Sequence, residues 1–417
     1  MSIRNDRDFL RIWSGQVVSN LGDGVHRVAV LWWANQATGS STAVVAVALA
    51  ASIPLLAMAP VAGVVVDRHD RRHVMIASDL VRLAAAAAFA ALAGTGHLTV
   101  PVAVALTAVA AAASGFFSPA LMASVTSLVP DDRLPTANSM IGGADAVAGI
   151  GGPALGGLLI GLAGTGGALW FDAGTFLLSV VAVAASRIPL PAGGGRRHDA
   201  AGESLRSQAL AGWRLARSNR AVGDLVLVAS MLNLVVAPVA IILVGLAAGP
   251  LGLDGKGYGL LEAAVPIGLL AGFASAVKLG KGRHAATVAL LVTGSAVAAS
   301  GAVVLAWWTG ALLVVAGVGI GVANTLVPTR FQRMVEPSVQ GRVFALVSAL
   351  SQAGRPIGLA LTAPLVALAG LRGGLAVCGV AMAVVALAGR RGLDGRRPAD
   401  PLDAGDTDPA SAAALAA

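Results

Sequence analysis

Five ionisable side chains interrupt long apolar stretches of the sequence: Asp23, Arg27, Asp145, Glu262 and Arg355. A charged group in hydrocarbon is costly, and such residues usually bind protons, ions or polar ligands. Asp23 and Arg27 are four residues apart, so they can pair on one helical face and hold each other in place. Asp145 and Glu262 have no cation as close in the sequence. We therefore expect these two acids to be the better proton carriers, with Asp23 as a third candidate.

Four further polar residues in apolar stretches are expected to have supporting roles. Asp79 and Arg82 are three residues apart near the start of one stretch and are expected to support the charged segment before it. Asp172 is expected to be structural, and His26 is either a packing and hydrogen-bonding residue or a proton site. A second interpretation covers all of these charges: permanent ion pairs that only orient helices.

The composition places most of the chain in lipid. Of the 417 residues, 56% are hydrophobic and only 12% are charged, and the mean hydropathy is +0.80. A soluble domain has about 25% charged residues, so this chain lacks the polar surface to face water. The single cysteine, Cys378, excludes an internal disulfide framework. The first apolar stretch begins near Phe9 and lacks an A-x-A site, so no cleavable signal peptide is expected.

The elements that must position the charges are membrane-spanning helices. A span needs roughly 20 apolar residues, and the sequence predicts an all-α membrane protein with twelve of them. The break between the ninth and tenth spans is expected at Thr309 and Gly310. The predicted spans are 9–36, 42–66, 74–94, 98–124, 137–163, 167–187, 219–247, 257–278, 286–308, 310–329, 340–368 and 371–389.

The distribution of basic residues predicts the orientation. With twelve spans and the N-terminus inside, 24 of the 29 lysines and arginines lie in cytoplasmic segments. Such asymmetry follows the positive-inside rule and predicts that both termini are cytoplasmic. The basic residues form short clusters between apolar runs, which is a topology signal and argues against nucleic-acid binding.

The chain divides into two halves. A six-helix bundle is predicted over 1–187 and another over 219–389, with a cytoplasmic linker at 188–218 and a disordered tail at 390–417. At the linker, the stretch 203–220 is predicted to form a basic amphipathic helix on the inner membrane surface, with a solvated loop helix as the alternative. The stretch 118–139 resembles 327–348, with Pro119 matching Pro328 and Arg133 matching Arg342. This parallel repeat predicts two bundles related by pseudo-twofold symmetry with a central site between them.

One charged segment follows the second span and has the sequence "GVVVDRHDRR". It resembles the signature loop of the major facilitator superfamily, a Gly-x-x-x-Asp-Arg-x-x-Arg-Arg pattern filled by Gly63, Asp67, Arg68, Arg71 and Arg72. Asp70 replaces a second glycine, as is familiar in the macrolide-efflux-type and enterobactin-exporter-like branch. Gly63 is expected to allow close approach of a neighbouring helix. The resemblance implies a gate latch in which Asp67 is bound in one conformation and released in the other.

A second motif, "GIGGPALGGLL" in the fifth span, resembles the helix 5 motif of exporters in this superfamily. Gly152, Pro153, Gly156 and Gly157 match its core, although the two glycines expected further upstream are not both in register. The glycines thin the helix for tight packing. Glycine-rich packing without a preference for direction is the alternative interpretation.

The resemblance implies that helices 1, 2, 4, 5, 7, 8, 10 and 11 border a central cavity. The five charges of the apolar stretches would then form a network in its upper part, with Arg27, Arg355, Asn233 and Asn324 as candidates for binding substrate. The fourth span lacks the arginine that many proton-coupled relatives carry, so their proton relay does not transfer directly. The family implies alternating access around this site.

The resulting hypothesis is an exporter of small amphipathic organic compounds, whose expected partners are the lipid bilayer and the transported molecule. It would be proton-coupled, monomeric, without cofactor or metal, and located in the plasma membrane of the cell (the inner membrane where there are two). An uptake symporter or facilitator of the same fold stays open. A membrane-embedded transferase is less favoured, because its paired carboxylates would have to hold Mg²⁺ and here adjoin arginines.

Overall fold

A computed structural model describes residues 6–188, 220–279, 282, 284–334, 351 and 354–393. Every regular element in these ranges is helical. The helices are α1 (Arg7–Thr38), α2 (Ser41–Arg68), α3 (Arg71–Gly94), α4 (Val100–Leu128), the 3-10 turn η2 (Asp131–Arg133), α5 (Leu134–Ala184), α7 (Arg220–Ala248), α8 (Gly255–Leu279), α9 (Ala285–Ser300), α10 (Ala306–Met334), α12 (Gly354–Ala388) and α13 (Arg390–Leu393).

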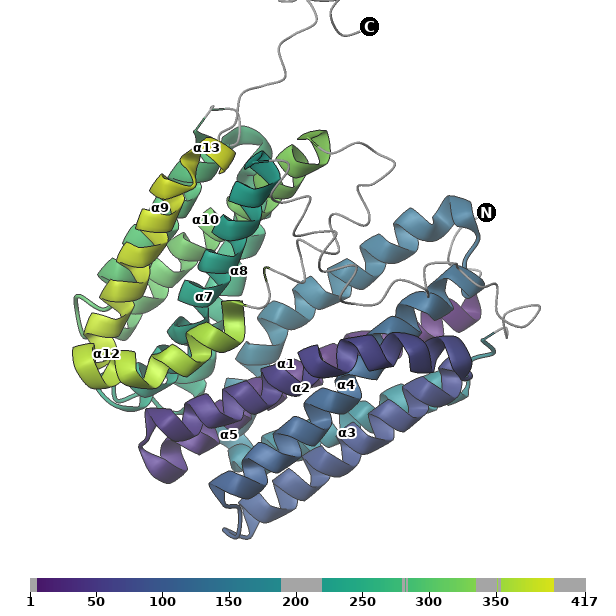
Figure 1. Ribbon diagram of the computed structural model, residues 1–417. Coiled ribbons are helices and arrows are strands. Elements are labelled where there is room, and N and C mark those ends of the chain that lie inside the picture. The colour runs from purple at the N-terminus through teal and green to yellow at the C-terminus, as the bar shows by residue number, and fades with distance from the viewer. Residues whose placement is uncertain are drawn as a thin grey trace, which may run out of the picture.

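The helices form two groups, which Figure 1 shows side by side. The first group contains α1 to α5 and the second contains α7 to α13. The groups lie close together at the lower left of Figure 1. They diverge toward α13 in the second group and toward the N-terminus in the first.

Two of the long helices are each interrupted by one glycine. Gly164 in α5 has φ 69° and Gly370 in α12 has φ 68°. Glycine adopts this left-handed conformation readily, so the chain can reverse there. The predicted turns between 163 and 167 and between 368 and 371 coincide with these glycines.

The predicted break at Thr309 and Gly310 is wrong. The structure ends α9 at Ser300 and begins α10 at Ala306, so both residues lie inside α10. The Thr309 hydroxyl donates to the carbonyl oxygens of Ser300 at 3.1 Å and Leu305 at 3.2 Å, which satisfies it within apolar surroundings. The true break, residues 301–305, consists of glycine and apolar residues, so hydropathy does not reveal it.

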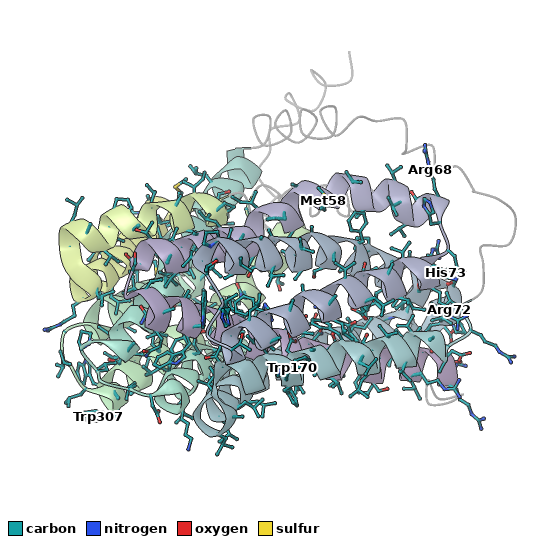
Figure 2. The ribbon with its side chains drawn as sticks, turned by 90° about the horizontal axis from the view of Figure 1, so that it is seen from below. Met58, Arg68, Arg72, His73, Trp170 and Trp307 are labelled. Atoms are coloured by element: carbon teal, nitrogen blue, oxygen red, sulfur yellow. The ribbon has the colours of Figure 1, made fainter. Side chains whose placement is uncertain are left out.

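Eight of the described helices are long and apolar enough to cross a membrane, and α9 is a shorter apolar helix. Large apolar side chains face outward from them, among them Trp170, Leu260 and Trp307. Exposed apolar surface of this extent suits a lipid environment. In Figure 2, Arg68, Arg72 and His73 lie at one end of the molecule and Trp307 lies at the other.

Glycines bring the helices of the second group into close contact. A Cβ atom at Gly268 of α8 would lie 2.9 Å from the Cα of Gly317 in α10, and one at Gly272 would lie 2.9 Å from the Cα of Gly321. Small residues allow two backbones to approach this closely in lipid. Gly358 of α12 packs in the same way against the backbone of α7.

The two groups meet through α5 and α8 and through α1 and α8. A Cβ at Gly157 would lie 2.5 Å from the Cα of Gly259, so only glycines fit at this crossing. Nearby, the Trp32 ring stacks on Tyr258 with 5.4 Å between ring centroids. Gly157 lies near the end of the first part of α5 (134–163), and Tyr258 and Gly259 lie at the beginning of α8.

Several predictions lie outside the described residues. They are the linker and its amphipathic helix (189–219), the second copy of the repeat beyond Met334 with Arg342, the first part of the eleventh predicted span, and the tail from residue 394. The start of the predicted tail differs from the expectation, because residues 390–393 form the short helix α13 and Leu393 is buried.

Candidate functional site

The strongest concentration of buried charge joins three helices of the first group. Arg82 of α3 donates to both carboxylate oxygens of Asp23 in α1, at 2.6 Å to Oδ2, and to Oδ1 of Asp79 at 3.1 Å. Asp79 also accepts a hydrogen bond from the Ser179 hydroxyl at 2.6 Å, from the second part of α5 (165–184). We call Asp23, Asp79 and Arg82 the acid cluster.

The acid cluster is buried on one side and open on the other. Asp79 is 0% exposed and Arg82 is 4% exposed, whereas the Asp23 side chain is 44% exposed. The Arg82 guanidinium lies 4.1 Å from the ring centroid of Phe176, a cation–π contact. Two carboxylates therefore share one guanidinium, which leaves one negative charge that a single proton would neutralise.

A third acid, outside the acid cluster, lies close to it. Asp172, from the second part of α5, is 0% exposed. Its Oδ2 lies 2.9 Å from Nδ1 of His26 in α1, while its Oδ1 has no hydrogen-bond partner among the described residues. His26 also packs edge-on against Phe89, with 6.1 Å between ring centroids. A buried carboxylate with one free oxygen can accept a proton or a further donor.

The structure corrects two expectations about these residues. Asp23 pairs with Arg82, not with Arg27, because α1 and α3 both pack against α5 and the long side chain of Arg82 reaches both carboxylate oxygens. Asp79 and Arg82 do not support the signature loop. Counted at 1.5 Å per residue from the start of α3, Arg82 is ~16 Å into a helix of 24 residues, close to its middle.

The sequence predicted only a structural role for Asp172 and left two roles open for His26. The signal that identifies all of them is simple: each is ionisable and lies within an apolar span. Spacing within one helix favoured the pairs i,i+3 and i,i+4. The bonds that join α1 to α3 and to α5 depend on tertiary packing, which spacing does not show.

The acid cluster opens into a cavity of about 240 Å³ between the two groups. Asp23, Arg27 and Arg82 line it from the first group, and Arg355 lines it from α12 of the second. Most of the remaining wall is apolar. The structure thus brings three of the five predicted charges, Asp23, Arg27 and Arg355, to one cavity.

Glu262 and Asp145 lie elsewhere. Glu262 of α8 accepts a hydrogen bond from the Tyr258 hydroxyl at 3.3 Å, close to the contact between the groups. It interacts electrostatically with Arg27 without forming an ion pair. Asp145 of α5 is exposed and accepts from Nδ2 of Asn20 in α1 at 2.6 Å. Neither carboxylate lines the cavity of the acid cluster.

The two predicted asparagines lie in a different cavity. Asn233 of α7 and Asn324 of α10 line a space of about 340 Å³ within the second group, together with Leu290 and Met382. The Asn233 amide donates to the Ala229 carbonyl at 3.0 Å, so part of its capacity is used within its own helix.

In the signature loop, Arg71 and Arg72 are bound to helix ends, whereas Asp67 and Arg68 have no partner among the described residues. Arg71 donates to the carbonyl of Ala123 at the end of α4 at 2.6 Å, and Arg72 donates to the carbonyl of Ala184 at the end of α5. Asp70 caps α3 by accepting from the Arg72 amide at 2.9 Å. Arginines at the carboxyl ends of helices are favoured by the helix dipole.

Asp67, Arg68 and Gly63 are all exposed, and Asp67 and Arg68 have no ion-pair or hydrogen-bond partner among the described residues. A Cβ at Gly63 would meet no atom within 4 Å. Among the residues that the structure describes, none makes the expected close approach at Gly63. An acid and a glycine that face open space are what a released latch would present.

The glycines of the second motif lie at two helix crossings. A Cβ at Gly152 would lie 2.7 Å from the Cα of Gly24, and one at Gly156 would lie 3.1 Å from the Cα of Val25, both in α1. Gly157 faces α8 in the other group, and Pro153 lies inside the same helix. The motif thus packs α5 between α1 and α8, as tight packing predicts.

Comparisons with known proteins agree with this architecture. The family model described as Major Facilitator Superfamily matches residues 12–359. The chain is 24% identical over 366 residues to macrolide efflux protein A of Streptococcus pyogenes, covering 85% of this chain and 88% of that protein. It is 29% identical over 374 residues to the multidrug efflux pump Tap of Mycobacterium tuberculosis, covering 84% and 85%.

Solved structures share the fold at low sequence identity. A bacterial homologue of the iron transporter ferroportin in an inward-facing state has a TM-score of 0.71 at 16% identity, covering 95% of this chain and 100% of that one. A bacterial homologue of the lysosomal transporter Spinster, inward-facing and unoccupied, has a TM-score of 0.71 at 14% identity, covering 94% and 99%. This chain therefore belongs to the major facilitator superfamily and is a multi-pass membrane transporter rather than an enzyme.

Proposed function

We propose that this transporter exports small amphipathic organic compounds in exchange for protons. The observation that carries the proposal is the acid cluster, which has an unbalanced negative charge and opens into a cavity between two helix groups. Two relatives named as efflux pumps and the helix 5 motif support the outward direction.

The proposed topology has twelve spans in two six-helix bundles, with both termini on the cytoplasmic side of the plasma membrane. The clustering of basic residues supports it. On this topology, the contacts of Gly157 with Gly259 and of Trp32 with Tyr258 lie on the outer side. The groups diverge toward the cytoplasm, so the structure would be in an inward-facing state in which the latch at Asp67 is released.

The proposed coupling step is protonation of the acid cluster. A proton on Asp23 leaves Asp79 to balance Arg82 and weakens the bond between α1 and α3, whereas a proton on Asp79 leaves Arg82 to Asp23 and strengthens that bond. Since α1 also packs on α5 through Gly24 and Gly152, a shift of α1 would reach the crossing of α5 with α8. Asp145 and Glu262 stay candidates for proton transfer, and no proton relay through helix 4 is needed.

The test uses inside-out membrane vesicles that contain the protein and a panel of fluorescent amphipathic compounds. We expect uptake into vesicles with an acidic interior and loss of that uptake after an uncoupler. Asp79→Asn and Asp23→Asn should abolish gradient-driven uptake, whereas Asp132→Asn, which changes an exposed acid near η2, should not.

Two results would contradict the proposal. Uptake that is unchanged by the uncoupler would indicate a facilitator or another coupling ion. Gradient-driven accumulation only in right-side-out vesicles would indicate an uptake symporter. Loss of uptake in Asp145→Asn or Glu262→Gln alone would keep the exporter but move its proton site.

A further inference from the structure

Two arginines on the wall of the central cavity have no acid partner. Arg27 of α1 and Arg355 of α12 both line the cavity and are both exposed to it. Neither forms an ion pair with any residue that the structure describes, in contrast to Arg82 behind them. An arginine within the membrane normally pairs or faces a site with a function.

The acids near these arginines are already engaged. Asp23 lines the same cavity, but both its carboxylate oxygens accept from Arg82. Glu262 is close enough to Arg27 for their charges to interact, yet it accepts its hydrogen bond from Tyr258 and forms no ion pair with any described residue. The lining therefore presents three guanidinium groups and one carboxylate.

The rest of the wall suits an apolar body. Val30, Leu31 and Val47 line the cavity from the first group, and Ile241 and Leu359 line it from the second. Ligand sites commonly combine such a wall with a few converging polar groups. Here those polar groups are cationic, and guanidinium binds carboxylate, sulfonate and phosphate groups through paired hydrogen bonds.

We propose that the cavity binds a small amphipathic organic anion, with its acidic group between Arg27 and Arg355 and its apolar body against the aliphatic wall. This inference deepens the proposed export function, because it names the class of compound that the same cavity accepts. It differs from a site for cationic drugs, because the two charges of Arg27 and Arg355 outnumber the one net negative charge of the acid cluster at this cavity.

The position of the two arginines gives the anion a role in the transport cycle. Arg27 belongs to the first group and Arg355 to the second, and their like charges interact unfavourably across the cavity. An anion between them replaces this repulsion with two attractions. Binding therefore favours approach of the two groups around the substrate, which is the movement that closes the inward-facing cavity.

The first test needs no variant. The purified full-length protein in nanodiscs of phosphatidylcholine, which supplies no anionic lipid, is titrated with 4-phenylbutyrate, 4-phenylbutylamine and 4-phenylbutanol. These probes share one apolar body and differ in charge. Binding is measured by equilibrium dialysis of radiolabelled probe, with empty nanodiscs subtracted. We expect saturable binding of the anion at least tenfold tighter than binding of the cation or the alcohol.

The second test places the anion between the arginines. Arg27→Gln and Arg355→Gln should each weaken 4-phenylbutyrate binding roughly tenfold to a hundredfold, the usual effect of losing a hydrogen bond to a charged group. Arg27→Lys and Arg355→Lys should retain part of it. Arg187→Gln, which removes an exposed arginine away from the cavity, should leave binding unchanged.

Preference for the cation or the alcohol in the wild-type protein would overturn the proposal. So would binding of 4-phenylbutyrate by Arg27→Gln and Arg355→Gln that is as tight as binding by the wild-type protein. Neither measurement uses a proton gradient. Anion binding without gradient-driven transport would therefore leave this inference standing and remove the proposed export function. Export of cations or neutral compounds only, without anion binding, would support the proposed export function and overturn this inference.

Discussion

Glycine contacts pack helices in both groups, but only the first group adds ion pairs between its described membrane helices. In the first group, Arg82, Asp23, Asp79 and Ser179 connect α1, α3 and α5 by charged hydrogen bonds. In the second group, glycine contacts such as Gly268 with Gly317 join α8 to α10. Among the described membrane helices, ion pairs connect only helices of the first group.

This difference separates two tasks. A close contact between backbones has no titratable part, so it persists when protonation changes. Where two carboxylates share one guanidinium, the net charge of the group changes whenever a carboxylate gains or loses a proton. The first group is therefore suited to sense protons, and the second group is suited to supply a rigid wall that carries Arg355.

The largest effect is expected from Arg82→Gln. This change leaves Asp79 buried without its cation, and breaking a buried pair by removing one partner costs about 3–5 kcal/mol. We expect a large fall in the unfolding temperature in detergent, measured by intrinsic tryptophan fluorescence. Arg187→Gln serves as the control. Equal unfolding temperatures of the two variants would show that the acid cluster does not stabilise the first group.

In the second group, Gly268→Ala should be the damaging change. Its Cβ would lie 2.9 Å from the Cα of Gly317 and closer still to the Val314 carbonyl, and overpacking of this kind costs about 1–3 kcal/mol. Gly143→Ala, with no atom within 4 Å of its Cβ, should be neutral or slightly stabilising. The unfolding temperature of both variants is measured in the same way. An unchanged unfolding temperature for Gly268→Ala would mean that α8 and α10 can move apart without a cost in stability.

A smaller contrast uses one buried serine from each group. Ser179→Ala removes the hydrogen bond to the Asp79 carboxylate at 2.6 Å, and a hydrogen bond to a charged group is worth about 1.5–3 kcal/mol. Ser300→Ala removes only a bond to the Val297 carbonyl of its own helix and should change the free energy of unfolding by less. Equal effects would show that the charge of Asp79 does not strengthen its bond.

The smallest effect is expected from Glu262→Gln. The amide oxygen can still accept from the Tyr258 hydroxyl, and no ion pair is lost. The free energy of unfolding should change by no more than about 0.5 kcal/mol, as for other mild substitutions. A loss comparable to that of Arg82→Gln would place a second charged cluster at the contact between the groups.

Much of the fold follows from local sequence features. Runs of apolar residues predict the helices, and Gly164 and Gly370 fall in the two predicted turns. The break between α9 and α10 escaped because residues 301–305 are as apolar as the helices on either side. The family signatures predict the charged loop and the glycine crossings of α5.

The site was predictable only in part. That Asp23, Arg27 and Arg355 share a cavity follows from the family resemblance. Which partner each charge takes does not, because Arg82 reaches Asp23 across a helix contact separated by 59 residues in the chain. Spacing within one helix favoured Arg27 as the partner of Asp23, but the packing of α1 and α3 on α5 brings Arg82 to it instead.

The most direct test of proton sensing in the first group compares two kinds of transport in proteoliposomes. Gradient-driven accumulation requires proton binding, whereas exchange of labelled for unlabelled compound at equal pH does not. The compound is one that the vesicle panel identifies. We expect Asp79→Asn to lose accumulation and keep exchange, and Glu262→Gln to keep both. Accumulation retained by Asp79→Asn and lost by Glu262→Gln would contradict this and place the proton site at the contact between the groups.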